Sequence, residues 1–256
     1  MPGKKMNIRL YLIVFVLLLA ACGQQKPAGT TTKPPDYKLY NELLQKYVNE
    51  EGYVDYGGLL EEKSKLERFL TELSYHPPAD NWSRKEKLAY WINAYNAFTL
   101  KLILDNYPLE GIKDIGPVLQ IPYVNSVFDI RFININGVNL DLNFIEHQVL
   151  RKEFNEPRIH FAINCASVSC PPLRRGAYVA EKLDEQLQDQ AVRFVTGPQN
   201  EISKERMLLS KIFKWFSGDF TTKGSLTDFI QQYTQVPIDE NTSIFFKEYN
   251  WNLNEQ

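Results

Sequence analysis

A long apolar segment at residues 84–106 is the feature that most restricts the fold of this chain. Ser83 and Glu86 form a capping-box pattern, in which the serine hydroxyl and the glutamate side chain satisfy free amides of a first helical turn. A helix is therefore predicted from this cap to about Asn106. Its middle, residues 88–104, is apolar nearly all round, so other parts of the fold have to cover every side of it. We expect one buried central helix.

Short strands and helices follow this helix in an irregular order. Residues 127–135 alternate between apolar and polar, and Asn136-Gly137 supplies the positive φ angles of a tight turn, so a β-hairpin with residues 138–140 is expected. Asp141 then caps a helix. Residues 158–164 alternate as a short strand, with Ile159, Phe161 and Ile163 on one face and His160, Ala162 and Asn164 on the other.

The remaining patterns complete a mixed set of elements. Residues 180–194 predict a helix, Ser210 and Ser225 each cap a further helix, and residues 243–249 predict a strand. No regular strand–helix–strand rhythm is present, so the sequence favours an α+β fold. We therefore expect a single mixed domain, in which a small, mostly antiparallel sheet accompanies the buried central helix.

The first 21 residues have the pattern of a secretory signal rather than of a folded element. Lys4, Lys5 and Arg9 precede an uninterrupted apolar run at residues 10–21. The run is about twelve residues long, whereas a helix that spans a bilayer needs roughly twenty apolar residues. A cleaved signal peptide is therefore predicted in preference to a transmembrane anchor.

The end of this run, Leu19-Ala20-Ala21-Cys22, resembles the lipobox of bacterial lipoproteins. The resemblance implies a lipid on Cys22 and attachment to a membrane of the cell envelope, on the periplasmic side. Gly23 follows in place of Asp, which favours the outer membrane. Residues 22–36 are polar and contain prolines, so we expect a lipidated, flexible tether before a globular domain at residues 37–256.

Charge and missing motifs count against several classes of function. Removal of residues 1–21 takes away three basic residues and no acidic one, so the net charge falls from −2 to −5, which disfavours a nucleic-acid partner. The sequence has no glycine-rich phosphate loop, no G-x-S-x-G elbow and no H-E-x-x-H helix. Cys165 and Cys170 lack the second pair of a usual zinc site. Neither a cofactor nor a metal is expected.

Five segments of the chain resemble the domain-of-unknown-function 547 family. They occur in the family's order and extend across most of the mature domain: AYWINAYNAFTLKLIL (89–104), LNFIEHQVLR (142–151), RIHFAINCASVSCPPLR (158–174), LSKIFKWFSGDF (209–220) and YNWNLN (249–254). The resemblance implies no particular activity, because the family has none assigned. It implies kinship with bacterial secreted proteins and lipoproteins, and with plant and animal proteins that join the domain to others, including glutaredoxin-like ones. The family motif places a cysteine at Cys165, whereas the position of Cys170 can be serine.

Cys165 is the leading candidate for a catalytic residue. It follows the expected strand in a loop of small residues, where exposed amides can stabilise a thiolate or an oxyanion. A nucleophilic cysteine also needs a base within hydrogen-bonding reach. His147, beside Glu146 on an expected helix, ranks above His160, because five residues of strand would separate His160 from Cys165 by roughly 16 Å and point the two to opposite faces. His76 is expected in a loop.

Structural roles compete with each of these assignments. In an oxidising compartment Cys165 and Cys170 can form a small disulfide, and they can also be inert buried thiols. Either histidine can be a hydrogen-bonded core residue. Asn93 and Asn96 share one side of the central helix, where they can line a pocket or tie neighbouring loop backbones.

Two functions follow from these alternatives. The first is a membrane-anchored envelope lipoprotein that acts as a thiol-dependent hydrolase or acyl transferase, with Cys165 as nucleophile, His147 or His160 as base, and Glu146 and Asn93 as supporting groups. The second is a non-catalytic lipoprotein that binds an envelope protein or a glycan, with a Cys165–Cys170 disulfide as a structural link. Thiol redox exchange ranks third, because C-x4-C is not the C-x-x-C of that chemistry.

Overall fold

The structure is a computed structural model that describes residues 33–117, 121, 124–239 and 241–256. The predicted signal peptide, Cys22 and most of the predicted tether lie outside the described residues. The α-helices are α1 (Lys38–Tyr47), α2 (Tyr56–Glu61), α3 (Lys63–Tyr75), α4 (Arg84–Leu104), α5 (Arg151–Glu153), α6 (Ile159–Ala162), α7 (Leu183–Val195), α8 (Lys211–Trp215), α9 (Ser217–Phe220) and α10 (Leu226–Gln231). The other elements are the 3-10 helices η1 (Ile112–Asp114), η2 (Val127–Asp129) and η4 (Ala180–Lys182), the π-helix η3 (Phe144–Leu150), and the strands β1 (Ile133–Ile135), β2 (Val138–Leu140), β3 (Glu201–Ile202), β4 (Arg206–Leu209) and β5 (Ser243–Phe246).

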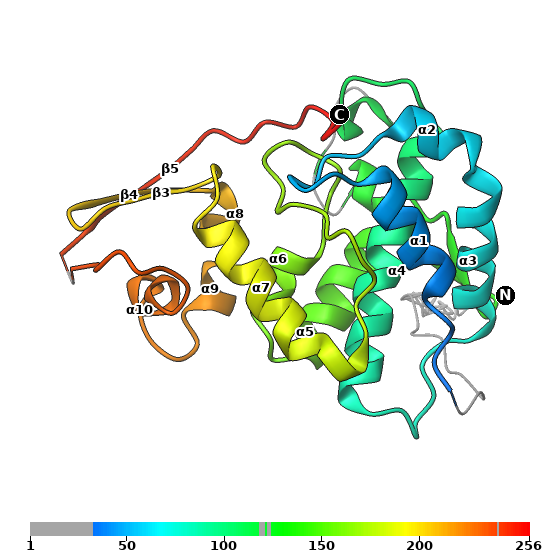
Figure 1. Cartoon of the computed structure of the whole chain (residues 1–256), viewed down its shortest axis with the longest axis horizontal. Helices are drawn as coiled ribbons and strands as arrows, with labels where there is room; N and C mark the ends of the chain where they lie inside the picture. The colour runs from blue at the N-terminus through cyan, green and yellow to red at the C-terminus, as the bar shows by residue number, and fades with distance from the viewer. Residues whose placement is uncertain (1–32, 118–120, 122–123, 240) are drawn as a thin grey trace, which may run out of the picture.

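Helix α4 is the central element of the fold, as predicted. Ser83 caps it, with the Ser83 hydroxyl accepting from the amide of Glu86 and the Glu86 carboxylate accepting from the amide of Ser83. Its side chains from Leu88 to Leu100 are all buried. Helix α3 packs against α4, and α1 packs against α3. These helices lie on one side of α4, while α6 and α7 lie on the other (Figure 1).

The predicted hairpin is confirmed, but its first strand is shorter than expected. Strands β1 and β2 are antiparallel, and Asn136 and Gly137 between them have φ values of 50° and 77°. Residues 127–129 form the 3-10 helix η2 instead of a strand, because Asp129 accepts hydrogen bonds from both the amide and the hydroxyl of Ser126. A local cap therefore outweighs the alternating pattern at this point.

The predicted strand at residues 158–164 is wrong, because residues 159–162 form the short helix α6. The two faces expected from the alternation do not exist, since Ile159, His160 and Phe161 are all buried. Asn96 on α4 supplies hydrogen bonds that end the helix: its Nδ2 donates to the carbonyl of Ala162, and its Oδ1 accepts from the amide of Asn164. A side-chain amide from a distant element thus satisfies backbone groups that a neighbouring strand was expected to satisfy.

The α+β fold class is confirmed. Strands β1 and β2 form a two-stranded sheet, and β3, β4 and β5 form a second sheet. Of the strand pairings in the described part of the chain, β1–β2 and β3–β4 are antiparallel and β4–β5 is parallel. The predicted helices capped by Ser210 and Ser225 are present as α8 and α10. The expected helix at residues 180–194 is η4 followed by α7.

Residues 249–254, which we call the crossing segment, join distant parts of the molecule. In Figure 1 the chain after β5 runs in extended form over the molecule towards α2. The amide of Val168 donates to the carbonyl of Asn252 at 2.9 Å. The amide of Leu253 donates to the carbonyl of Glu110 at 2.8 Å. The amide of Val54 donates to the carbonyl of Asn254 at 2.9 Å. The crossing segment therefore connects the loop after α6, the loop before η1 and the turn before α2.

Buried apolar residues form two clusters. The larger surrounds α4 and includes side chains from α1, α2, α3, η3 and the hairpin, and the smaller lies between α7, α8, α9, α10 and the second sheet. Phe161 of α6 belongs to the smaller cluster, while its neighbour Ile159 belongs to the larger. In the described ranges, no helix has both the length and the apolar character that a membrane span requires.

Candidate active site

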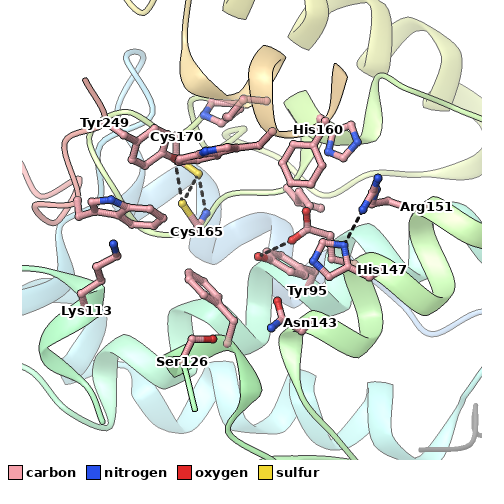
Figure 2. Close-up of a pocket in the computed structure, with 18 residues that line it drawn as sticks. Tyr95, Lys113, Ser126, Asn143, His147, Arg151, His160, Cys165, Cys170 and Tyr249 are labelled. Carbon is pink, nitrogen blue, oxygen red and sulfur yellow. Dashed lines mark hydrogen bonds between the residues drawn. The ribbon is translucent and has the colours of Figure 1, made fainter. Parts of the chain in front are cut away.

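A pocket of about 530 Å³ brings together side chains from widely separated parts of the chain. The residues that line it include Tyr95, Lys113, Glu146, His147, Cys165 and Tyr249. Cys165 lies between Lys113 on one side and Tyr95, His147 and Arg151 on the other (Figure 2). The pocket thus collects titratable groups around the cysteine that the sequence singled out.

The loop after α6 holds Cys165 in a fixed position. Ala166 has a φ of 58°, a left-handed conformation that is uncommon for a residue with a side chain. Asn164 stabilises this turn, since its Oδ1 accepts from the amide of Ala166 at 2.8 Å and its Nδ2 donates to the carbonyl of Pro171 at 2.7 Å. The sharp turn after Asn164 lets Cys165 face the same pocket as His160, which a straight strand could not do.

The sulfur of Cys165 has three hydrogen-bonding neighbours among the described residues. They are Ser167 Oγ at 3.2 Å, Tyr249 Oη at 3.3 Å and Cys170 Sγ at 2.6 Å. Burial raises the pKa of Cys165, but the hydrogen bonds from Cys170, Ser167 and Tyr249 outweigh it and lower this pKa to about 7. A substantial fraction of Cys165 is therefore a thiolate at neutral pH.

Cys170 is the buried partner of Cys165. Both cysteines are free thiols in the structure. The amide of Cys165 donates to Cys170 Sγ at 2.8 Å. Burial and the neighbouring Cys165 raise the pKa of Cys170 well above its ordinary value. The two sulfurs therefore differ in character: Cys165 carries the thiolate, and Cys170 acts as a donor to it.

Glu146 is a buried carboxyl group in the same pocket. It lies on the π-helix η3, a rare helix type that occurs often at functional sites. Tyr95 Oη donates to Glu146 Oε2 at 3.4 Å. Burial and the charge of the Cys165 thiolate raise the pKa of Glu146 to about 7. Glu146 is thus poised to release or accept a proton at neutral pH.

His147, Arg151 and Asp219 form a connected network at the side of the pocket. Asp219 accepts from Arg151 Nε at 2.6 Å and from Arg151 Nη2 at 2.9 Å. Arg151 Nη1 lies 3.0 Å from His147 Nδ1, and since a guanidinium can only donate, Nδ1 is the acceptor and the ring proton lies on Nε2. Burial and the charge of Arg151 lower the pKa of His147 to about 4. His147 is therefore neutral at pH 7.

His160 contacts the same network from α6. Its Nε2 lies 2.7 Å from Asp219 Oδ2, and its ring stacks on Phe216 with centroids 4.0 Å apart. The buried Nδ1 has no hydrogen-bond partner in the described part of the chain. Burial lowers the pKa of His160, although Asp219 opposes this effect. Neither His160 nor His147 is among the described hydrogen-bond partners of the Cys165 sulfur.

Asn93 lies apart from the pocket. Its Nδ2 donates to the carbonyl of Tyr178 at 2.8 Å, and its Oδ1 accepts from the amide of the same residue at 2.9 Å. Asn93 and Asn96 thus both tie loop backbones to α4, the structural alternative weighed for them. His76 is also remote, at the end of α3, where its Nδ1 contacts the carbonyl of Glu72. The structure therefore brings together Cys165, Glu146, His147 and His160 but not Asn93.

Two groups that line the pocket, Lys113 and Tyr249, and one that is bonded to pocket residues, Asp219, are absent from the sequence-based candidates. Asp219 holds Arg151 and His160, Tyr249 contacts Cys165, and Lys113 Nζ lies 3.9 Å from the ring centroid of Trp251. Tyr249 and Trp251 also pack on each other and on Trp215, with centroids between 4.5 and 5.9 Å apart. Asp219 and Tyr249 lie in the segments 209–220 and 249–254 that carry the family resemblance, and this is the sequence signal that could have found them.

Comparison with known proteins gives one match, to a family model that covers part of the chain. Residues 79–195 match the family described as "Protein of unknown function, DUF547". This range runs from before α4 to the end of α7 and contains Glu146, His147 and Cys165. No curated protein and no solved structure matches the chain. The described residues contain no group of His, Cys, Asp and Glu side chains that is arranged to hold a metal ion.

Proposed function

We propose that this member of the DUF547 family is a lipoprotein of the bacterial cell envelope and a thiol-dependent hydrolase or acyl transferase. Its nucleophile is Cys165, and its proton donor and acceptor is Glu146. The observation that carries the proposal is the pocket itself, in which a cysteine with a pKa lowered to about 7 accompanies a buried glutamate with a pKa raised to about 7. Perturbed groups of this kind gather at catalytic sites.

The charge states of Cys165 and Glu146 suit an acyl-transfer reaction. The thiolate of Cys165 attacks the carbonyl carbon of the substrate and forms a carbon–sulfur bond, while the carbonyl electron pair moves to oxygen. The tetrahedral intermediate then collapses, the bond to the leaving group breaks, and the leaving group takes the proton of Glu146. Water, or an acceptor alcohol or amine, next gives its proton to the Glu146 carboxylate and attacks the thioester. The products are the acyl product, the Cys165 thiolate and protonated Glu146, so the starting charge states are restored.

The histidines take supporting parts in this mechanism. His147 cannot accept a proton at Nδ1 while Arg151 donates there. His160 holds Asp219 through Nε2, and Asp219 in turn holds Arg151. We therefore assign the histidines to positioning η3, the element that carries Glu146, and replace the expected histidine base by the carboxyl group.

An acylation experiment tests the enzyme proposal. The folded domain is mixed with p-nitrophenyl acetate, release of p-nitrophenol is followed, and intact protein is analysed by mass spectrometry. We expect rapid acetylation of Cys165 followed by slow release of acetate. Cys165→Ser should abolish the fast phase, and Glu146→Gln should accumulate the acetyl thioester, because no carboxylate is present to take the proton from water. Acetylation of the wild type at sites other than Cys165 would refute the proposal.

The envelope anchor is a separate part of the proposal. It is supported by the basic start, the short apolar run and the Leu19-Ala20-Ala21-Cys22 sequence. Growth with radioactive palmitate should label the wild-type chain in the membrane fraction. Cys22→Ser should remove the label and leave an uncleaved precursor. Cys170→Ser is the control, because it changes a cysteine of the folded domain. Equal labelling of the wild type and Cys22→Ser would reject lipidation.

The second candidate function is a non-catalytic envelope lipoprotein that binds a protein or a glycan. The separation of 2.6 Å between the sulfurs of Cys165 and Cys170 favours it, because oxidation could join them with little movement. Mass spectrometry of protein taken from the envelope under acid, with thiols blocked, distinguishes the two functions. A fully oxidised pair would favour the binding function, whereas two free thiols would favour the enzyme.

A further inference from the structure

The loop between Cys165 and Cys170 holds their two sulfurs in contact. Asn164 Oδ1 accepts from the amide of Ala166 at 2.8 Å, and Asn164 Nδ2 donates to the carbonyl of Pro171 at 2.7 Å. Ala166 and Pro171 directly follow the two cysteines, so one side chain fixes both ends of the loop. The sulfurs lie 2.6 Å apart, joined by a dashed line in Figure 2. The C-x4-C spacing, which placed redox exchange third, therefore does not keep them apart.

The two thiols differ in the way that a redox pair requires. Cys165 is partly exposed in the pocket, whereas Cys170 is only 5% exposed. Burial raises the pKa of Cys165, but its hydrogen bonds outweigh this effect and lower the pKa to about 7, so Cys165 is the attacking thiolate. Burial raises the pKa of Cys170 well above its ordinary value. Cys170 is thus a protonated thiol, shielded from a reagent in the pocket but in contact with the sulfur that meets the reagent.

Aromatic side chains form a large part of the pocket wall. Phe128, Trp215, Tyr249 and Trp251 all line the pocket. Trp215 is 47% exposed, although its ring packs on Tyr249 and Trp251 with centroids 4.8 and 5.9 Å apart. A pocket of about 530 Å³ is far larger than hydrogen peroxide needs and has the size of sites that hold organic ligands. The wall therefore suits a reactant with an apolar organic group.

We propose that the Cys165–Cys170 pair gives this pocket a second activity, the two-electron reduction of an organic hydroperoxide to the corresponding alcohol. The inference rests on the proposed role of Cys165 as nucleophile, and it adds Cys170 as the resolving residue and a hydroperoxide as a substrate class. The nucleophile, the resolving thiol, the carboxyl group of Glu146 and the aromatic wall all belong to one pocket.

The reaction begins when the Cys165 thiolate attacks the terminal oxygen of the hydroperoxide. A sulfur–oxygen bond forms, the oxygen–oxygen bond breaks, and the leaving alkoxide takes the proton of Glu146 and departs as the alcohol. The Cys170 sulfur then attacks the sulfenic sulfur of Cys165, a disulfide forms, and the hydroxide leaves with the Cys170 proton as water. A dithiol reduces this disulfide by exchange and becomes a disulfide itself. Of the two protons that it transfers, Cys170 keeps one and Glu146 takes the other, which restores the starting state.

Peroxide consumption tests this activity in the full chain with Cys22→Ser, so that Cys165 and Cys170 are the remaining cysteines. The reduced protein is mixed with cumene hydroperoxide, and loss of peroxide and protein mass are followed. We expect formation of the Cys165–Cys170 disulfide, and continued consumption once dithiothreitol is added. Cys165→Ser should abolish consumption. Cys170→Ser, without dithiothreitol, should stop at the sulfenic acid, which dimedone traps on Cys165.

A comparison of two peroxides tests the organic substrate class. The rates of Cys165 oxidation by cumene hydroperoxide and by hydrogen peroxide are each divided by the rate with free cysteine. We expect the ratio of the two to favour cumene hydroperoxide. Trp215→Ala should lower this ratio roughly tenfold, because it removes part of the apolar wall.

Phe245→Ala is the matched control for Trp215→Ala. Phe245 lies on β5 and is 50% exposed, much as Trp215 is, but it is not among the residues that line the pocket. Its replacement should leave the ratio unchanged. A ratio that favours hydrogen peroxide, or one that Trp215→Ala does not alter, would reject the organic hydroperoxide as substrate.

The possible failures can be told apart. If Cys165 reacts rapidly with iodoacetamide but forms no disulfide with either peroxide, the second activity is refuted while the nucleophile stands. If Cys165 reacts with neither iodoacetamide nor peroxide in the folded protein, the proposed function falls as well. A Cys165–Cys170 disulfide that dithiothreitol cannot reduce in the folded protein would also refute the redox activity, because the pair would then be a structural link.

Discussion

The hydroxyl of Tyr249 is one of the groups that set the charge state of Cys165. It lies 3.3 Å from the sulfur and remains protonated, because burial raises its own pKa well above the ordinary value. Tyr249→Phe removes this donor and keeps the aromatic ring beside Trp251. We expect the midpoint of the pH dependence of Cys165 alkylation to rise from about pH 7, by on the order of one unit.

Ser167→Ala removes a second donor to the same sulfur and should shift the alkylation midpoint in the same direction. Ser203→Ala, in the turn between β3 and β4, serves as a control for removal of a hydroxyl elsewhere. Identical midpoints in wild type, Tyr249→Phe and Ser167→Ala would show that these hydroxyls do not stabilise the thiolate.

Asn93 is expected to matter for stability and not for chemistry. Asn93→Ala leaves the buried amide and carbonyl of Tyr178 without their described partners, which costs about 1 to 3 kcal/mol for such groups. Urea denaturation of the variant should show this loss, and the alkylation rate of Cys165 in native buffer should be unchanged. If Cys165 is alkylated more slowly in fully folded Asn93→Ala than in wild type, Asn93 contributes to the reactivity of the active site.

At the residue scale, the sequence could locate the candidate site but not the role of each residue in it. Cys165, Glu146 and His147 stand in recognisable segments, and all of them line the pocket. We assign the acid–base role to Glu146 and not to a histidine, because Glu146 is buried and Arg151 donates to His147. A linear sequence reveals neither feature. Asp219 lies 68 residues from Arg151, so their pairing depends on the tertiary fold.

At the element scale, prediction succeeded where a local signal sets the structure. The caps at Ser83, Ser210 and Ser225 each begin a helix, and Asn136-Gly137 makes the expected turn. It failed at residues 158–164, where Asn96 ends the helix from another element. The π-helical form of η3 was likewise not expected, since the sequence pattern at Asp141 predicts a helix without specifying its type.

Gly111 controls how closely the crossing segment packs on the loop before η1. A Cβ at this position would lie 2.6 Å from the carbonyl oxygen of Trp251, which is backbone and cannot rotate away. Gly111→Ala should therefore displace Trp251 and Tyr249. We expect a loss of about 1 to 3 kcal/mol in stability, as for other overpacked sites, and slower alkylation of Cys165.

Gly218→Ala is the control for Gly111→Ala, because a Cβ on Gly218 would meet no atom within 4 Å. The control should fold with unchanged stability or a small gain, since alanine favours the helix. If Gly111→Ala also leaves both stability and alkylation unchanged, the crossing segment is not the rigid wall that its hydrogen bonds indicate.

For the whole molecule, Glu146 links stability to pH. Its pKa is about 7 in the folded protein, against an ordinary value of 4.5 for an exposed glutamate, so the folded state binds more protons than the unfolded state between these two pH values. Its contribution is therefore fully present below pH 4.5 and is lost as pH rises through 7. At pH 8, Glu146→Gln should have a higher melting temperature than wild type, and its free energy of unfolding should be greater by at most about 3 kcal/mol. At pH 4.5 the two proteins should differ little.

An exposed carboxylate provides the comparison for Glu146. Glu185→Gln, on the outer face of α7, should change the melting temperature little at either pH. If Glu146→Gln is less stable than wild type at pH 8, the ionised carboxylate is paired in the folded protein and does not destabilise it. A gain in stability combined with loss of acyl turnover would identify Glu146 as a group kept for function.

The fold class could be predicted from the sequence, but the arrangement of the helices and strands in space could not. The irregular order of helices and strands indicated α+β, and the apolar segment at 84–106 indicated the central helix, both of which are confirmed. The expected elements began at Ser83, although α1, α2 and α3 precede it. The parallel pairing of β4 with β5 joins residues on either side of three elements, which local patterns do not report.

The crossing segment also has a consequence for the order of events during folding. Tyr249 reaches Cys165 across 84 positions of chain, and Asn254 reaches Tyr56 across 198. Contacts of such high contact order form slowly, because each requires closure of a long loop. Until they form, Cys165 lacks the Tyr249 hydroxyl that lowers its pKa. A partly folded chain therefore carries a more ordinary, less reactive thiol, and the appearance of fast Cys165 alkylation during refolding marks one of the later steps in reaching the native state.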